Sequence, residues 1–341
     1  MKVLSFVIPA YNSETFLDKC IPSMLHLEVL EKLEIIVVND GSKDGTAAAA
    51  EKYCRQYPDT VQLINQENKG HGGALNTGCG AASGKYLKVI DADDWVVTEN
   101  LPTFLSKLES CDSDVVLTHH HTVDISTGEI KCWRNYPSEF GKVYTFGEIM
   151  SDWRSFDRSL TFHGITYRTD FYHRNGHALL EHVFYEDHEY ATYPCCYAES
   201  IMPIDLFIYE YRIGDINQSV SNLNQLKRIS HTETVLQQMI ALYEKLPTSD
   251  GQKYAAMKIQ GLLLSYLTTA LLVNPDRKAG RLMAKQQMEL CAGKVAEAYR
   301  LGLPKYRGFC LLNRLHINKH IWDKILASKL YNALRKNHDF T

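Results

Sequence analysis

The sequence predicts an α/β protein, in which a mostly parallel sheet is flanked by helices and followed by a helical C-terminal extension. Two observations support this fold class. Through residues 1–118, short apolar runs alternate with segments of helical periodicity, which is the pattern of a doubly wound sheet with right-handed crossovers. Polar, glycine-rich turns follow these apolar runs, and the carboxyl ends of parallel strands are where open sheets bind ligands.

The expected strands of this half are continuous apolar runs, as is typical of strands buried on both faces of a parallel sheet. They lie at residues 4–9, 33–38, 61–65, 85–90 and 115–118. Helical spacing predicts helices at residues 46–57, 73–82 and 101–108, and another after Ser13, which can cap its first turn. Pro22 lies inside this last pattern and is expected to kink the helix or to shift its start.

The second half of the chain is less regular. Residues 130–225 are rich in aromatic side chains, with a helix expected near residues 146–153 and strands at 164–168 and 206–212. Helical periodicity follows over residues 229–246, 253–272, 281–299 and 321–336. We therefore expect one domain over residues 1–225, divided into halves 1–118 and 119–225, and a helical region over residues 226–341.

The net charge is −3, from 37 Lys and Arg against 40 Asp and Glu, so no global basic field indicates a nucleic-acid partner. The charge is uneven, because residues 300–341 hold nine Lys or Arg against two Asp. That tail therefore carries +7, which leaves −10 for residues 1–299.

Cysteine usage indicates a reducing compartment. Nine cysteines without CxxC spacing favour neither a disulfide framework nor a zinc site, so we expect a cytoplasmic protein. The first residues read as a strand rather than as a signal peptide. The longest apolar stretch, residues 259–273, is interrupted by polar side chains, so we expect a buried helix and no membrane crossing.

Asp40 follows the second expected strand and is followed by Gly41 and Ser42. A carboxylate at the mouth of the sheet can accept hydrogen bonds from a ligand, and glycine allows a sharp turn beside it. Asp and Ser also make ordinary helix-capping turns. Taken alone, this turn favours the capping interpretation.

Asp91, Asp93 and Asp94 follow the fourth expected strand within four residues. Three carboxylates so close repel one another, and Mg²⁺ or Mn²⁺ bound together with substrate phosphates would neutralise them. The alternative is a solvated turn with Asp94 as a cap. Because the cluster lies at the ligand-binding edge of the sheet, we favour a metal site.

Glu186 and Asp187 are acidic residues within an aromatic segment. Partly apolar surroundings raise the basicity of a carboxylate, which suits proton abstraction. An exposed acidic helix start explains the same pattern equally well.

Two further motifs are weaker. The glycine-rich residues 70–73 do not complete a dinucleotide fingerprint, because Leu75 stands where glycine or alanine is needed. Three successive histidines, residues 119–121, would alternate between the two faces of a strand. We therefore expect a surface or core role for them rather than a metal site.

Taken in order, several motifs resemble those of family 2 glycosyltransferases with the Rossmann-like GT-A fold. They are residues 6–12 (FVIPAYN), 37–46 (VVNDGSKDGT), 68–70 (NKG), 74–78 (ALNTG), 84–86 (GKY), 91–94 (DADD), 185–187 (YED), 209–212 (YEYR) and 218–221 (QSVS). Each is weak alone, but the ordered set is specific, and it covers roughly residues 3–222.

The resemblance implies an inverting, metal-dependent transferase that uses a nucleotide-sugar donor, most often a UDP-sugar. In that interpretation residues 1–118 bind the nucleotide and residues 119–225 the acceptor. Asp187 would be the general base, and Asp93, with Asp91, would hold Mn²⁺ or Mg²⁺. The donor would contact Pro9, Ala10, Tyr11, Asn12, Glu14, Asp40, Lys69, Gly70, Asn76, Asp91, Ala92, Asp93 and Arg212.

The implied acceptor is a glycan or a lipid-linked oligosaccharide, as in the synthesis of cell-surface polysaccharides. Relatives often carry Trp-Asn-Lys in an acceptor-side strand, where this chain has His163, Gly164 and Ile165. The resemblance therefore carries no acceptor preference over to this chain, and the sequence does not specify the sugar or the linkage.

Two other functions fit a related α/β core. A sugar nucleotidyltransferase usually has a glycine-rich loop after the first strand, where this chain has residues 9–12 (PAYN). A non-catalytic module that binds nucleotide or glycan would not need both Asp93 and Asp187. We therefore favour the transferase.

The C-terminal third lies outside the resemblance. Apolar residues recur at helical spacing among the basic residues of 319–336, and a basic amphipathic helix can lie on an anionic membrane surface. The protein would then be peripheral on the inner face of the cell membrane. A helix that packs on its own protein with a solvated basic face is the equal alternative.

Overall fold

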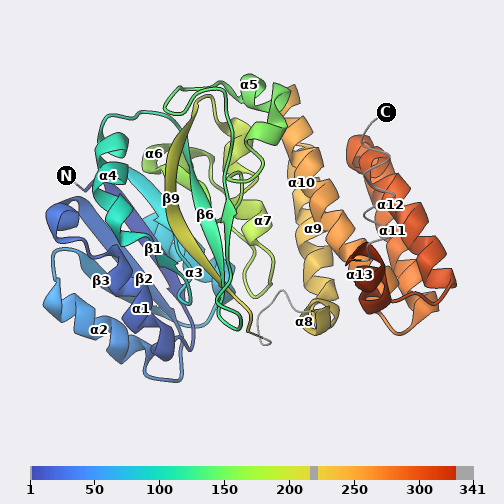
Figure 1. The fold of residues 1–341 in the computed structure, drawn as a ribbon, viewed down its shortest axis with the longest axis horizontal. Coiled ribbons are helices and arrows are strands. Elements are labelled where there is room, and N and C mark those ends of the chain that lie inside the picture. The colour runs from blue at the N-terminus through green and yellow to red at the C-terminus, as the bar shows by residue number, and fades with distance from the viewer. Residues whose placement is uncertain (1, 216–221, 328–341) are drawn as a thin grey trace. The chain divides into compact units, whose positions relative to one another are not determined.

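The computed structural model describes residues 2–215 and 222–327 (Figure 1). The chain divides into two compact units, one made of Met1–Gln218 and Leu246–Ala255, the other of Ser219–Lys245 and Ala256–Thr341. The predicted boundary at residue 225 stays a prediction.

The first unit contains a nine-stranded, mostly parallel sheet, which confirms the predicted α/β class (Figure 1). The order is β3-β2-β1-β4-β8-β6-β9-β5, with β7 paired to β6. Strands β1 to β4 run parallel, as do β6 and β9, whereas β8 is antiparallel to both of its neighbours. The strands are β1 (Leu4–Ala10), β2 (Leu33–Asp40), β3 (Val61–Gln66), β4 (Tyr86–Val89), β5 (Trp95–Val96), β6 (Val115–Asp124), β7 (Ile130–Trp133), β8 (Ile165–Arg168) and β9 (Ile201–Ile213).

The helices of this unit are α1 (Glu14–Met24), α2 (Thr46–Gln56), α3 (Gly70–Ala81), α4 (Leu101–Glu109), α5 (Phe146–Ser151), α6 (Thr169–Asn175) and α7 (Asp187–Tyr190). Helix α1 begins after Ser13, but the Ser13 hydroxyl donates to the Tyr11 carbonyl (3.2 Å) instead of capping the helix. Pro22 falls in the last turn of α1, which continues to Met24. Helix α3 starts at Gly70, earlier than the predicted residue 73.

The apolar core of the sheet explains why the first strands could be predicted. All seven residues of β1 are buried, and so are all residues of β2 except Glu34. Leu17, Ile21 and Phe104 of the flanking helices α1 and α4 pack into the same cluster. Burial on both faces leaves no room for the polar alternation of a half-exposed strand.

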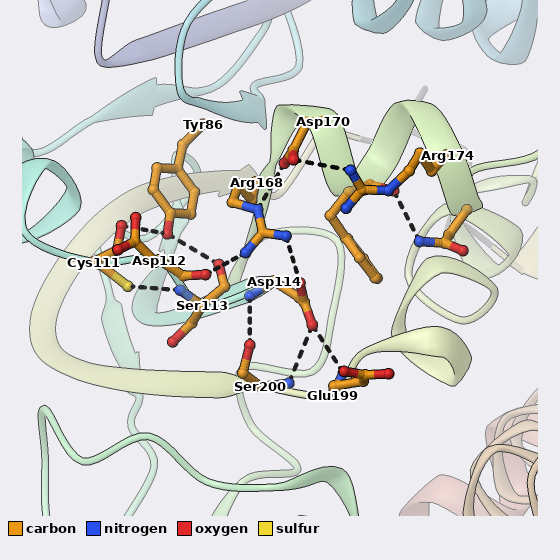
Figure 2. A network of polar contacts seen from close by, with 12 residues as sticks. Tyr86, Cys111, Asp112, Ser113, Asp114, Arg168, Asp170, Arg174, Glu199 and Ser200 are labelled. Atoms are coloured by element: carbon orange, nitrogen blue, oxygen red, sulfur yellow. Dashed lines mark hydrogen bonds and ion pairs between the residues drawn. The ribbon is translucent and has the colours of Figure 1, made fainter.

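A polar network pins the amino ends of the strands (Figure 2). The Arg168 guanidinium lies 3.0 Å from an Asp114 oxygen, and the other Asp114 oxygen accepts the backbone N–H groups of Glu199 (2.9 Å) and Ser200 (3.2 Å). These residues precede β6 and β9 or end the antiparallel β8, so all lie at one edge of the sheet. The network fixes that edge, which is opposite to the one where the candidate site lies.

The second unit is helical in the part that the structure describes. It contains α8 (Asn222–Lys227), α9 (Ile229–Tyr243), most of α10 (Ser249–Thr268), the π-helical turn η5 (Thr269–Val273), α11 (Arg277–Lys294), α12 (Ala296–Arg314) and α13 (Lys319–Ala327). Helix α13 begins near the predicted basic helix, whose residues 328–336 lie outside the described ones, as do residues 218–221 of the family motif.

One helical stretch among the described residues, Ser249–Val273, is long and apolar enough to cross a bilayer, and 56% of its most apolar window is buried. Core helices of globular proteins pass the same test, so this finding alone does not indicate a membrane span.

Candidate active site

A cleft of about 330 Å³ opens where β1 and β2 end. It brings together five of the residues predicted to bind the donor, namely Pro9, Ala10, Tyr11, Asp40 and Gly70. The other residues that line it were not predicted: Asn68, His71, Ala74, His182, Val183 and Phe184. The cleft therefore lies at the carboxyl edge of the sheet, as the order of strands and polar turns predicted.

Asp40 is buried at the floor of this cleft. Its Oδ1 accepts hydrogen bonds from Gln66 Nε2 (2.7 Å) and from the Lys69 backbone N–H (2.8 Å), while Oδ2 has no hydrogen bond to any described residue. Gly41 follows at φ +71°, and a side chain there would meet the Asn68 backbone at 2.8 Å. The carboxylate is thus held in place with one oxygen left for a ligand.

Asn12 and Glu14 join the loops around the cleft rather than lining it. Asn12 adopts φ +49° and its Oδ1 accepts the Lys43 N–H (2.9 Å). Glu14 Oε2 accepts the Gly45 N–H (2.9 Å). These bonds tie the loop after β1 to the loop after β2, so both residues support the walls of the cleft.

Asp94 has a structural role in the acidic triplet formed by Asp91, Asp93 and Asp94. It is buried, and its carboxylate accepts the Tyr209 hydroxyl (2.5 Å) and the Arg212 backbone N–H (2.7 Å). Burial, together with Asp91 and Asp93, raises the pKa of Asp94 well above its usual value. The structure thus replaces the solvated turn considered for Asp94 with a buried link between the loop after β4 and strand β9.

Asp91 and Asp93 keep partly exposed side chains, at 29% and 34%. Asp91 Oδ1 faces His71 Nε2 at 2.9 Å, and Asp93 Oδ2 lies 3.5 Å from Arg212 Nη1. Burial and the neighbouring Asp91 carboxylate raise the pKa of Asp93. His71 also faces Glu186, and Arg212 also pairs with Asp215, so four carboxylates share two cationic side chains.

Asp91 and Asp93 fit a divalent cation that takes most of its other ligands from the bound substrate. In the described parts of the chain no group of three or more His, Cys, Asp or Glu could hold a metal by itself. However, the side-chain contacts of Asp91 and Asp93 use Asp91 Oδ1 and Asp93 Oδ2, which leaves the other oxygen of each without a side-chain partner among the described residues. Mg²⁺ typically takes one or two carboxylates together with substrate phosphates, which is what these two oxygens offer.

Asp187 is the first residue of α7 and is partly exposed. Its carboxylate makes no hydrogen bond or ion pair with a described residue. Burial and then the carboxylates of Asp94, Asp91, Asp187 and Asp93 raise the pKa of the Tyr211 hydroxyl. Glu186, the residue before Asp187, bonds to His71, which also contacts Asp91, so the start of α7 is joined to the acidic triplet through one side chain.

His71 links the two acidic segments and was missed by the sequence reasoning. Its Nε2 lies 2.9 Å from Asp91 Oδ1, and its Nδ1 lies 2.5 Å from Glu186 Oε1. Burial opposes protonation, but the two carboxylates prevail and raise the pKa of His71 well above its usual value. In the sequence, the only indication of His71 is its position within the glycine-rich residues 70–73, which do not complete a dinucleotide-binding motif.

The remaining predicted contacts lie beside the cleft. Lys69 precedes α3 with an exposed side chain, and Ala92 is buried between the aspartates. Arg212 pairs with Asp93, as described, and with Asp215 (3.2 Å). The side chain of Asn76 bonds the backbone of Leu179 at both of its polar ends (3.0 and 2.8 Å). These site assignments stay predictions.

Comparison with known proteins decides the family. The model of glycosyl transferase family 2 matches residues 5–175, which is half of the chain. The chain belongs to glycosyltransferase family 2. It is therefore a transferase enzyme, as the resemblance implied.

Glycosyltransferase GlyA of Streptococcus pneumoniae is 31% identical over 144 residues, 41% of this chain and 20% of GlyA. Glycosyltransferase GlyG of the same species is 32% identical over 128 residues, 37% of this chain and 42% of GlyG. The chain thus spans less than half the length of these two relatives. Residues 1–349 of S. aureus TarS, solved with UDP-GlcNAc, match at a TM-score of 0.60 and 18% identity over 93% of each chain, which supports the predicted GT-A fold.

The three successive histidines of this family 2 glycosyltransferase lie in β6, where His119 and His120 are buried. His119 is buried against Asp205 (3.1 Å), and His121 faces Glu210 (2.8 Å). Burial lowers the pKa of His120, between them, to about 3. The rings of His119 and His121 both pack on Phe207, whereas the His120 ring stacks on Trp133, so the side chains alternate along β6.

A second hollow, of about 500 Å³, lies beside the polar network of Figure 2. It is larger than the cleft, but Asp114 and Arg168, which line it, already bond to each other and to neighbouring groups. It also lies at the amino edge of the sheet. The smaller cleft is therefore the candidate active site, and its role in catalysis stays a prediction.

Glu189 gives the segment beside Asp187 a pH-dependent stability. Burial raises the pKa of Glu189 from 4.5 to about 8, and burial also lowers the pKa of His177. The two side chains, 3.6 Å apart, thus meet as neutral groups at pH 7. Between pH 4.5 and 8 the folded state keeps a proton on Glu189 that the unfolded state releases, so this contribution to stability falls as pH rises, by up to about 1.4 kcal/mol per pH unit.

We expect Glu189→Gln to remove that slope. Glutamine cannot ionise, so the variant should gain thermal stability relative to wild type as pH rises from 5 to 8. Melting temperatures measured across this range check the prediction. Parallel curves for the two proteins would show that Glu189 is already ionised in the fold.

Proposed function

We propose that this family 2 glycosyltransferase moves a sugar from a UDP-sugar to a hydroxyl group of a glycan or a lipid-linked oligosaccharide, with inversion at the anomeric carbon. The observation that carries the proposal is one juxtaposition. His71, which lines the cleft together with Asp40, contacts both Asp91 (2.9 Å) and Glu186 (2.5 Å), the residue before Asp187. The TarS structure, of similar fold, was solved with UDP-GlcNAc, which supports a UDP-sugar.

The cleft offers distinct contacts to a nucleotide. Asp40 Oδ2 can accept an N–H group of the base, and the exposed ring of Tyr11 can lie against it. The backbone around Pro9 and Ala10 shapes the wall, and Gly70 begins α3 at the rim. The positive end of that helix and the exposed Lys69 ammonium favour an anionic diphosphate nearby.

Asp91 and Asp93 would hold Mn²⁺ or Mg²⁺ against that diphosphate. A bound divalent cation offsets the negative charge that grows on the nucleoside diphosphate as it leaves. Arg212, beside Asp93, adds a positive charge that belongs to the protein itself.

Asp187 would be the general base. Its carboxylate is not engaged by any described side chain, so it can accept the proton of an acceptor hydroxyl as that oxygen attacks the anomeric carbon. Attack from the face opposite the leaving diphosphate gives inversion in one displacement. A single base and a neutralised leaving group suffice for this reaction, and no covalent nucleophile is required.

Nucleotide binding tests the donor site directly. We expect UDP with Mn²⁺ to raise the melting temperature of the protein, and Asp40→Ala to abolish that increase. Removal of the metal with EDTA should reduce it strongly. A melting temperature that UDP and GDP leave unchanged in Mn²⁺ would count against the donor site.

We further propose that the basic C-terminal helices bring the enzyme to an anionic membrane surface on the cytoplasmic side, where lipid-linked acceptors lie. Leu311 and Leu315 at the end of α12, and Ile321 and Ile325 in α13, are exposed. Arg314, Lys319 and Lys324 stand among them. Exposed apolar groups interspersed with basic ones are what an anionic bilayer surface attracts.

This proposal predicts that vesicles rich in phosphatidylglycerol sediment the protein at low salt. Deletion of residues 315–341 should abolish sedimentation, and neutral phosphatidylcholine vesicles serve as the control. Equal sedimentation of both proteins would show that the tail packs elsewhere.

A further inference from the structure

We propose that His71 is a positioning residue that couples the acidic metal motif to the general base. The inference rests on the proposed role of Asp187. One ring joins two loops that are far apart in sequence, with Nε2 on Asp91 (2.9 Å) and Nδ1 on Glu186 (2.5 Å). Glu186 immediately precedes Asp187, so the imidazole connects the site of the leaving group to the site of proton abstraction.

The segment that contains Glu186 packs against the first half of α3. The Leu179 backbone bonds Asn76, and the His182 N–H donates to the Lys69 carbonyl (2.9 Å). A side chain at Gly72 would lie 2.2 Å from the Leu180 carbonyl oxygen. The glycines of residues 70–73 therefore let the two backbones approach closely, and His71, between them, supplies the polar contact.

The segment needs such support because its backbone is strained. His182 and Tyr185 adopt φ +58° and +76°, a region that bulky residues occupy only when their surroundings impose it. The Glu186 carbonyl accepts the N–H groups of Glu189 (2.8 Å) and Tyr190 (3.1 Å). Glu186 thus starts α7, and its position sets that of Asp187.

The Glu186 side chain depends on His71. It is buried, and His71 is its only hydrogen-bonding partner among the described residues. A buried carboxylate left without its partner is unfavourable enough to rearrange its surroundings. Loss of His71 should therefore displace Glu186 and, with it, the adjacent base.

Double-mutant kinetics test this coupling. We expect His71→Ala and Glu186→Ala each to lower kcat by about 10–100-fold, as loss of a residue that orients a ligand typically does, with a smaller change in KM for the donor. The double variant should be no slower than the slower single variant, because the residues act as one unit. In an Asp187→Asn background His71→Ala should add little. Losses that multiply would overturn the proposal, as would wild-type kcat in His71→Ala.

Hydrogen exchange tests the same coupling without turnover. In His71→Ala we expect the amides of His182 and residues 188–191 to exchange at least about tenfold faster than in wild type. His71→Gln, which can reach only one carboxylate, should give a smaller effect and keeps the test usable if the alanine variant misfolds. His173→Ala is the matched control, because His173 bonds the Cys79 carbonyl at the other end of α3 (2.9 Å).

The kinetic and the hydrogen-exchange experiments together show which part of the proposal is wrong if one of them fails. Unchanged exchange in both His71 variants would overturn the positioning role, whatever the enzyme transfers. Faster exchange together with normal turnover in Asp187→Asn would leave the link between His71 and Glu186 standing and would remove Asp187 as the base.

Discussion

Replacing Asp187 by asparagine is expected to slow sugar transfer by about 10²–10⁴-fold, the range that a general base contributes, while UDP affinity stays nearly unchanged. Asparagine has almost the same shape as aspartate but cannot take up the proton of the acceptor hydroxyl. Because Asp187 lies outside the lining of the nucleotide cleft, donor binding should not depend on it. Steady-state turnover and a UDP titration, on the same preparations, check both halves of the prediction.

Glu181→Gln is the matched control for this variant. Glu181 is an exposed carboxylate on the same segment and is not among the residues that line the cleft, so the substitution makes the same chemical change without altering the lining. We expect its turnover to equal that of wild type. Wild-type turnover in Asp187→Asn would instead mean that another group accepts the proton.

Replacing Asp93 by asparagine should lower turnover by a comparable factor, because the metal that stabilises the leaving diphosphate would bind more weakly. An amide binds a hard divalent cation more weakly than a carboxylate does, and the 3.5 Å ion pair between Arg212 and residue 93 would be lost. We expect the Mn²⁺ concentration needed for half-maximal UDP binding to rise at least about tenfold, and turnover to fall by about 10²–10³-fold. Calorimetric titration of UDP at several Mn²⁺ concentrations measures the first quantity.

An exposed aspartate away from the cleft, Asp59, gives the control for this second prediction. Asp59→Asn should leave the Mn²⁺ dependence as it is in wild type. If Asp93→Asn binds UDP with the same Mn²⁺ dependence, the metal is held elsewhere and the assignment of Asp93 is wrong.

The sequence predicted those parts of the fold that depend on local pattern. Strands β1 and β2 are buried on both faces and therefore read as continuous apolar runs. Asp40 and Asp91 could be assigned to the ligand edge because each directly follows such a strand. The predicted start of helix α3, residue 73, is three residues too late. Its first turn is glycine-rich, and its conformation depends on the segment that packs against it.

Side-chain partners between distant segments could not be predicted. His71 and Glu186 are 115 positions apart, and only the folded path of residues 177–190 brings them together. For the same reason the sequence could not show that polar atoms of Asn12, Glu14 and Asn76 bond neighbouring loops. Their assignment as ligand contacts stays a prediction. Spacing indicates the edge at which a side chain lies, but not which of its atoms remain available.

Donor hydrolysis is the most direct measurement of whether this site handles a nucleotide-sugar. Purified protein would be incubated with a panel of UDP- and GDP-sugars and Mn²⁺, with and without EDTA, and the released nucleotide detected. We predict slow release of UDP from one UDP-sugar, abolished by EDTA and by Asp93→Asn. Absence of release from every donor, together with no metal-dependent binding of UDP, would contradict the account.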